Sequence, residues 1–171
     1  MKTEVKNLLL KLHSRIIARE NEGNEFLNQM LTSMASVPGF EQNVMRGEQY
    51  HNEASMYYNQ SDYSKAFELF SNAIQKYPNA GSYYSRGVTA MDLNDIERAI
   101  ADFSSAIQFD ENYVNAYHNR ALCFLQLIES FDLKHDVECK PLVDFARNDL
   151  KKAISLGNPE SKRFLDMSYN D

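Results

Sequence analysis

The sequence predicts an all-α fold, an α-solenoid of three helical hairpins with helices before and after it. Two observations carry this prediction. Residues 62–78 read DYSKAFELFSNAIQKYP, and residues 95–111 repeat this segment, at a shift of 33, as DIERAIADFSSAIQFDE. A third segment, FARNDLKKAISLG, repeats the same spacing of small and large residues around Ala146. With only 6 glycines and 4 prolines, the chain has few residues that interrupt helices.

Each hairpin is predicted from two patterns, a large residue followed by a small one on its first helix and a small–large–small spacing on its second. The second helices carry Ala66, Phe70 and Ala73, then Ala99, Phe103 and Ala106, then Ala146, Leu150 and Ala153. The first helices carry Tyr50, Ala54 and Tyr57, then Tyr83, Gly87 and Ala90, then Tyr117, Ala121 and Phe124. A period near 34 is typical of stacked helical hairpins, because small residues let backbones approach and large ones fill the space between neighbours.

These positions resemble the pattern of tetratricopeptide repeat (TPR) proteins over residues 47–158. The resemblance implies a right-handed solenoid with repeats at about 47–79, 80–113 and 114–158, forming a TPR domain over residues 46–171. Two features depart from the family pattern. The closing proline is Pro78 in the first repeat, Glu111 in the second, and Pro159, one place late, in the third. The usual tryptophan of the first helix is tyrosine in all three repeats.

The third repeat contains an insertion. The shift from Ala99 to Ala146 is 47 where about 34 is expected, so the excess of 13 is placed at Ile128–Lys140, and Pro141 is expected to open the next helix. Two interpretations stay open. The insertion is either a tolerated surface loop or a partner contact or an arm over the groove.

Both ends are predicted to be helical. A capping helix at 159–169, with Asn158 before it, is expected to cover the last hairpin with Phe164, Leu165 and Met167. Residues 1–45 form an N-terminal helical extension with two apolar stripes, one of Val5, Leu8, Leu9, Leu12 and Ile16, the other of Phe26, Leu27, Met30, Leu31 and Met34. The extension is expected to pack against the first hairpin or another subunit, so a homodimer is a hypothesis, with membrane-surface binding as the less favoured alternative.

Charge and cysteine content limit the partners. The net charge of −6 argues against a nucleic-acid partner, which needs a basic face. Residues 1–19 carry +4, which leaves −10 for the rest of the chain. Cys123 and Cys139 form no metal or redox motif, no signal peptide is recognised, and no apolar run reaches the roughly 18 residues of a membrane span. We therefore expect a reduced, cytoplasmic setting and consider membrane association unlikely.

The TPR resemblance implies that the first helices of the hairpins line a concave groove that binds a protein or peptide. The residues expected to face this groove are His51, Ser55, Tyr58, Tyr84, Val88, Met91, His118, Leu122 and Leu125. Glu48, Asn59, Asp92, Asn115 and Gln126 are polar neighbours on the same face. TPR domains that clamp the carboxylates of chaperone tails need lysine, arginine and asparagine here, whereas this chain has His51, Ser55, Ser85, Asn115 and Asn119. The lining therefore favours a ligand with apolar side chains.

No enzyme, cofactor or metal site is predicted. The glycines are scattered, no nucleophile motif occurs, and His51 and His118 lie two repeats apart. His135, Asp136, Glu138 and Cys139 are better explained as solvated charge than as metal ligands. The predicted function is a non-enzymatic interaction module or scaffold. The alternatives are a dedicated chaperone or inhibitor of one secreted or toxic partner, and a structural self-associating protein whose groove is filled by its own ends.

Overall fold

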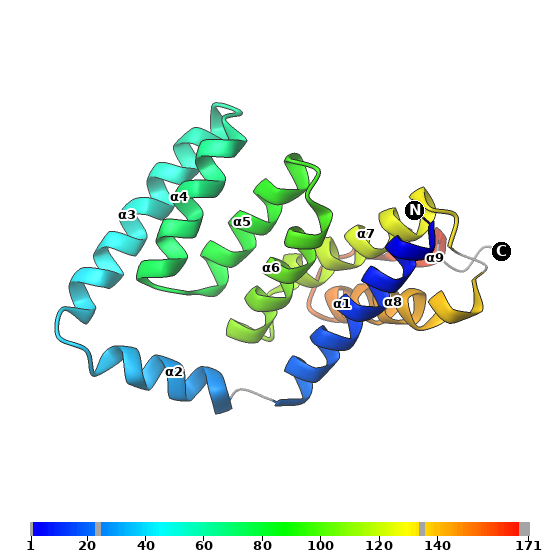
Figure 1. The fold of residues 1–171 in the computed structure, drawn as a ribbon, viewed down its shortest axis with the longest axis horizontal. Coiled ribbons are helices and arrows are strands. Elements are labelled where there is room, and N and C mark those ends of the chain that lie inside the picture. The colour runs from blue at the N-terminus through cyan, green and yellow to red at the C-terminus, as the bar shows by residue number, and fades with distance from the viewer. Residues whose placement is uncertain (1, 23–24, 134–135, 168–171) are drawn as a thin grey trace. The chain divides into compact units, whose positions relative to one another are not determined.

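The computed structural model describes residues 2–22, 25–133 and 136–167 of the 171 residues. These residues form α-helices and one short 3-10 helix without any strand, which confirms the all-α prediction (Figure 1). The elements are α1 (Lys2–Glu22), α2 (Glu25–Ala35), α3 (Phe40–Asn59), α4 (Tyr63–Lys76), α5 (Ala80–Asp92), α6 (Ile96–Phe109), α7 (Val114–Ser130), η1 (Val137–Cys139), α8 (Lys140–Ser155) and α9 (Ser161–Met167).

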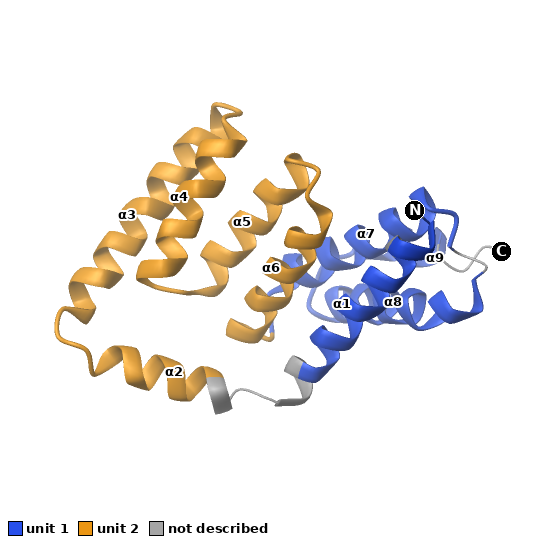
Figure 2. Ribbon diagram, in the orientation of Figure 1, with its two compact units in different colours: residues 1–19, 112–171 blue, residues 20–111 orange. Residues whose placement is uncertain are grey.

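The helices pair as the repeat predicts. Helix α3 packs against α4, α5 against α6, and α7 against α8, giving three successive hairpins. The chain divides into two compact units, one of residues 20–111 and the other of residues 1–19 with 112–171 (Figure 2). The first contains α2 and the first two hairpins, and the second contains α1, the third hairpin and α9. Each unit is described by itself below.

Short polar residues set the start of the helices. The Asp62 side chain accepts a hydrogen bond from the Lys65 amide, and Asp95, at the same place in the next repeat, accepts one from the Arg98 amide. These side chains satisfy amides that have no partner inside the helix. One residue before each cap, Ser61 and Asn94 adopt positive φ angles of 62° and 58° and turn the chain between the two helices.

Small residues occupy the closest contacts between helices, as predicted. Ala66, Ala99 and Ala146 are each fully buried at 0% exposure. Gly87 shows why size is restricted, because a Cβ atom at this position would lie 2.8 Å from the ring of Phe103. The repeated alanine and glycine positions are therefore fixed by packing, and the backbone of α5 approaches α6 too closely for a larger side chain.

Buried ion pairs join the two helices of the second and third hairpins. Arg86 on α5 donates two hydrogen bonds to Asp102 on α6, at 2.8 and 2.7 Å. Arg120 on α7 does the same to Asp149 on α8, at 2.7 and 2.8 Å. The shift is 34 between the arginines and 47 between the aspartates, so the pair recurs with the repeat and its insertion. The first hairpin has Glu53 and Leu69 at the corresponding places.

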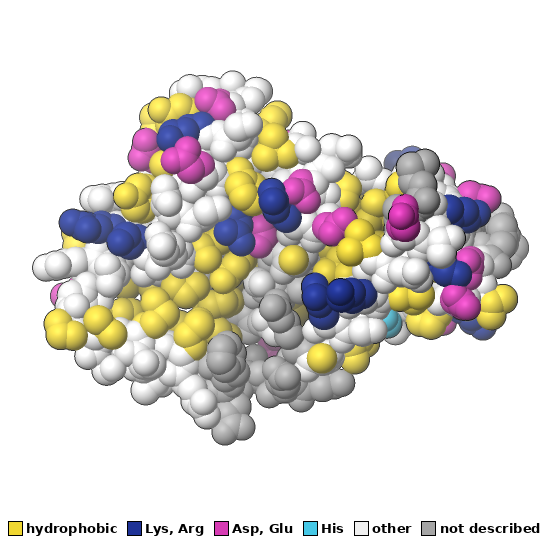
Figure 3. Space-filling model, viewed as in Figure 1, with side chains coloured by type: hydrophobic (Ala, Val, Ile, Leu, Met, Phe, Trp, Pro, Cys, Tyr) yellow, Lys and Arg dark blue, Asp and Glu magenta, His cyan; other side chains and the backbone are white. Residues whose placement is uncertain are grey.

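Helix α1 packs against the third hairpin. Leu9 and Ile16 are buried at 1% and 4% exposure, and the His13 ring lies edge-on to Phe145 of α8 at 4.9 Å. The expectation that the extension packs on the first hairpin is therefore wrong for α1, whereas the alternative, a contact with a second subunit, stays a prediction. Leu9 and Ile16 of its apolar stripe are thus used within the chain, whereas Leu8 is 38% exposed, and basic side chains lie on its outer surface (Figure 3).

The insertion holds α1 in place. Lys2 pairs with Asp132 at 3.3 Å, and Lys6 pairs with Asp136 at 3.1 Å and with Glu138 at 2.6 Å. All three acids lie within the predicted insertion, whose Leu133 and Cys139 are buried. Residues 128–130 of the insertion extend α7, residues 137–139 form η1, and Pro141 stands in the first turn of α8 as predicted. The inserted residues are thus in part a docking site for α1.

The other ends differ in detail from the predicted ranges. Helix α3 begins at Phe40, directly after Gly39, whose φ of 83° is a left-handed conformation that glycine adopts without steric cost. Helix α9 begins at Ser161, whose amide donates to the Asn158 side chain at 3.3 Å. Leu27, Met30, Leu31 and Met34 of α2 are half-buried. Residues 168–169 of the expected capping helix and the side chains of Val5 and Phe26 lie outside the described residues.

Removing one partner of the buried ion pair of the third hairpin is expected to destabilise the protein strongly, because the other charge stays buried. Asp149→Ala leaves the Arg120 guanidinium, which is 1% exposed, without its carboxylate, and should lower the free energy of unfolding by about 3–5 kcal/mol. Asp102→Ala is the matched control, because Arg86 is 21% exposed and water can replace its partner. Urea unfolding of both variants measures the difference. An equal or smaller loss for Asp149→Ala would contradict this account.

Candidate functional site

The predicted groove residues of the first two hairpins lie on neighbouring first helices. His51, Ser55 and Tyr58 come from α3, and Tyr84, Val88 and Met91 come from α5. All six side chains are half-buried. Two hydrogen bonds join the two helices: His51 Nδ1 lies 3.0 Å from Ser82 Oγ, and the Tyr58 hydroxyl donates to Asp92 at 2.7 Å. These bonds hold His51 and Tyr58 of α3 against α5, the helix that carries the other three predicted residues of the 20–111 unit.

Several of these polar groups are already engaged within the protein. The Ser55 hydroxyl donates to the His51 carbonyl at 3.0 Å, and the His51 ring lies edge-on to Phe70 at 5.1 Å. Burial, followed by the hydrogen bond to Asp92, raises the pKa of Tyr58 to about 12, so its hydroxyl stays a neutral donor at physiological pH. Tyr84 packs at 5.7 Å from the ring of Phe103. Hydrogen bonds and ring contacts within the protein therefore fix the positions of these side chains.

The third hairpin repeats this arrangement with α9 in the role of the next first helix. His118 Nδ1 lies 2.7 Å from Ser161 Oγ of α9, as His51 does from Ser82 of α5. The Phe164 ring packs edge-on to His118 at 5.5 Å. The caps correspond as well, since Asn79 and Asn158 each accept the amide of the serine three residues on. Helix α9 therefore contacts α7 in the same way as α5 contacts α3.

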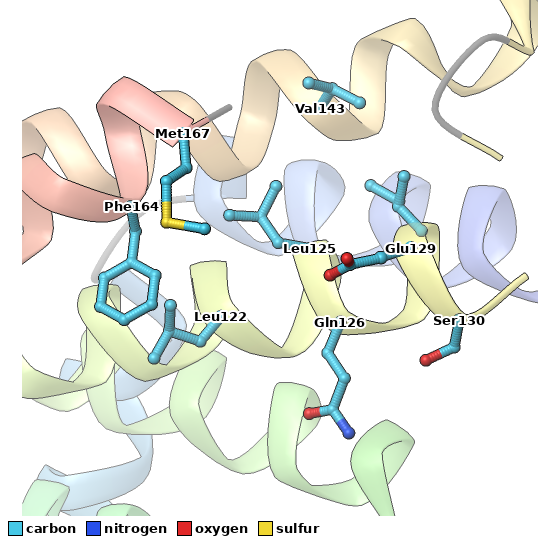
Figure 4. A pocket seen from close by; sticks show the side chains of 9 residues that line it. Leu122, Leu125, Gln126, Glu129, Ser130, Val143, Phe164 and Met167 are labelled. Carbon is cyan, nitrogen blue, oxygen red and sulfur yellow. The ribbon is translucent and has the colours of Figure 1, made fainter. Parts of the chain in front are cut away.

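An apolar cleft lies beside the two predicted groove leucines of α7. It has a volume of about 510 Å³ and is lined by Leu122, Leu125, Gln126, Ile128, Glu129, Ser130, Val143, Phe164 and Met167. Figure 4 shows Phe164 and Met167 of α9 on one side and the α7 residues on the other, with Val143 of α8 beyond them. The structure thus brings together Leu122 and Leu125, which the sequence indicated, with Phe164 and Met167 of α9, the helix that was expected to cover the last hairpin.

Sequence reasoning missed Glu129 and Ser130 as lining residues. The insertion was placed from Ile128 onward, and α7 was not extended into it. The signal was present, because Glu129 follows Leu125 by four residues and so lies on the same helical face. His118, Leu122 and Leu125 belong to the second compact unit, so the nine predicted residues are placed in two separate groups and their common groove stays a prediction.

The described side chains offer little reactive chemistry. Residues 2–22, 25–133 and 136–167 contain no group of three or more His, Cys, Asp or Glu side chains placed to hold a metal ion. His135, one of the loop residues considered as a ligand, lies outside the described residues. Burial raises the pKa of the Cys123 thiol to about 12 and also raises that of Cys139, so both stay protonated. No helix in the described part of the chain is long and apolar enough to cross a membrane.

The two groove histidines are expected to make stability depend on pH. Burial lowers the pKa of both His51 and His118 from the ordinary 6.5. The unfolded chain therefore takes up protons first as the pH falls through 6.5, so the stability that is present above this pH is lost below it. The double variant His51→Gln, His118→Gln should lose less stability than the parent between pH 7.5 and 5.5 in urea unfolding. Identical pH slopes would show that neither histidine is responsible.

Three comparisons with known proteins agree with this geometry. A family model described as "TPR repeat" matches residues 89–127. The chain is 29% identical over 122 residues to the DnaJ homolog subfamily C member 7 homolog of Dictyostelium discoideum, covering 68% of this chain and 23% of that protein. The chain therefore corresponds to less than a quarter of the length of this relative.

Two solved structures resemble the fold. The first TPR of Spaghetti (RPAP3) bound to the HSP90 peptide SRMEEVD has a TM-score of 0.63 at 17% identity, covering 73% of this chain and 91% of that one. The TPR2B domain of yeast Sti1 in its pHsp70 complex has a TM-score of 0.55 at 28% identity, covering 73% and 94%. Residues 89–127 therefore match the model of the TPR repeat, and the helical hairpins of the chain have the fold of the solved TPR domains.

Proposed function

We propose that this chain is a non-enzymatic protein-interaction module that binds a peptide, or a segment of a partner protein, on the concave face formed by the first helices of its hairpins. The proposed contact residues are His51, Ser55, Tyr58, Tyr84, Val88, Met91, His118, Leu122 and Leu125. The observation that carries the proposal is the apolar cleft beside Leu122 and Leu125.

The cleft differs from the packed interior behind it. Ala121 and Phe124 on the same helix are fully buried, whereas Leu122 and Leu125 are half-buried and Met167 is 59% exposed. Leaving apolar side chains in contact with water is unfavourable, and a ligand that covers them gains about 25 cal/mol per Å² of apolar surface. The cavity volume of about 510 Å³ is within the range of roughly 300–1,000 Å³ that is typical of ligand pockets.

The solved relatives support a binding role. The RPAP3 domain holds a peptide, and the Sti1 domain is described as a complex with pHsp70. The described side chains here include no metal-holding cluster, and both cysteines are free, buried thiols. The free thiols also support our proposal of a reducing, cytoplasmic setting. A homodimer through the N-terminal helices stays a prediction, because α1 uses Leu9 and Ile16 within its own unit.

Charge placed on the proposed face should remove partner binding. Leu122→Glu and Tyr84→Glu should each lower the amount of a specific partner that co-purifies from the native cells by about tenfold or more, because an apolar ligand would have to cover a carboxylate. The partner is quantified by mass spectrometry.

Matched controls place the same charge elsewhere in each unit. Val137 and Met56 are 85% and 62% exposed and lie outside the proposed face, so Val137→Glu and Met56→Glu should retain the partner. Circular dichroism checks that all four variants are folded. Undiminished capture by both Leu122→Glu and Tyr84→Glu would refute the proposed function.

A further inference from the structure

We infer that the cleft between α7 and α9 accepts an amphipathic helix with a lysine or arginine at the end of its apolar face, and discriminates against an acidic peptide. This inference rests on the proposed function and names the ligand class of the same site. It depends on the shape of the cleft and on the charge of its lining.

The lining forms two rows that suit a helix. Leu122, Leu125 and Glu129 lie on one face of α7, and the first and last are seven positions apart, which is about two turns and about 10 Å. Phe164 and Met167, three residues apart on α9, form the opposite row. A channel with an apolar row on each side is the arrangement that receives amphipathic helices, whose apolar residues recur every three or four positions.

The charge of the lining favours a cation at one end of this channel. Glu129 is the one charged side chain among the nine lining residues, and these include no lysine, arginine or histidine. It is exposed, and its carboxylate makes no hydrogen bond or ion pair with another described side chain. The carboxylate points along the edge of the cleft toward Leu125 (Figure 4). A ligand cation can pair with it, whereas a ligand carboxylate would meet a like charge without a compensating donor.

The test uses the full chain and two synthetic helical peptides, each about four turns long. Both peptides carry leucines at four positions spaced by three or four residues, and they differ only in a lysine or a glutamate one turn beyond the last leucine. Fluorescence anisotropy should show the lysine peptide binding roughly tenfold more tightly than the glutamate peptide, because an attraction is exchanged for a repulsion. Glu129→Lys should reverse this order.

Two controls separate the local charge from other effects. Glu97→Lys makes the same charge change at an exposed position outside the cleft and should preserve the order of the two peptides. Leu122→Glu should weaken both peptides, which locates them in the cleft.

Several results would overturn the inference. The first is equal affinity of the chain for the two peptides, or no binding of either. The second is an order of affinities that Glu129→Lys leaves unchanged. The third is a dimer of the chain, seen by light scattering, that the lysine peptide dissociates, because this would assign the cleft to a second copy. None of them refutes the proposed function, which is tested separately by capture of the cellular partner with Leu122→Glu and Tyr84→Glu.

Discussion

The ion pair between Arg120 and Asp149 is the interaction on which the third hairpin depends. A guanidinium that is 1% exposed is stable only when a carboxylate satisfies it, and here two hydrogen bonds of 2.7 and 2.8 Å do so. Since Arg120 on α7 must donate to both carboxylate oxygens of Asp149 on α8, α7 cannot rotate about its axis without breaking a bond. Leu122 lies about 200° around the helix from Arg120, so the same restriction turns the leucine away from α8 and toward the cleft.

The contacts between neighbouring first helices explain why the cleft has a second wall. The histidine on α3 meets a serine on α5, and the histidine on α7 meets a serine on α9. Each of these serines, Ser82 and Ser161, follows a capping asparagine by three residues. The asparagine caps the start of the helix, and the serine hydroxyl holds the helix against the preceding histidine. In the third hairpin this brings Phe164 against His118 and places α9 beside the α7 leucines. The helix that closes the apolar end of the solenoid thereby also forms part of the candidate binding surface.

Features that recur with the repeat could be predicted from the sequence, whereas contacts that occur once could not. Ala66, Ala99 and Ala146 could be placed because the packing of hairpins requires small residues at a fixed interval. The contacts of Lys6 with Asp136 and Glu138 join segments far apart in the chain and occur once, so they cannot be predicted from the repeat period. They account for the incorrect placement of α1.

The two remaining differences have local causes. The arginine–aspartate pairs do recur with shifts of 34 and 47, but they are not part of the apolar pattern from which the fold was predicted. Glu129 was missed because the insertion was assigned from Ile128, although α7 continues regularly to Ser130. Polar residues that repeat with a known period, and residues one turn beyond an expected helix end, therefore contain structural information that apolar patterns alone do not.

The central claim is that the exposed face of α7, together with α9, is the working surface of the third hairpin. Amide chemical-shift changes on adding the lysine-bearing helical peptide to the full chain test it most directly. The account predicts the largest changes at residues 122–129 and 161–167. Changes confined to α1 and to residues 131–139 would contradict it.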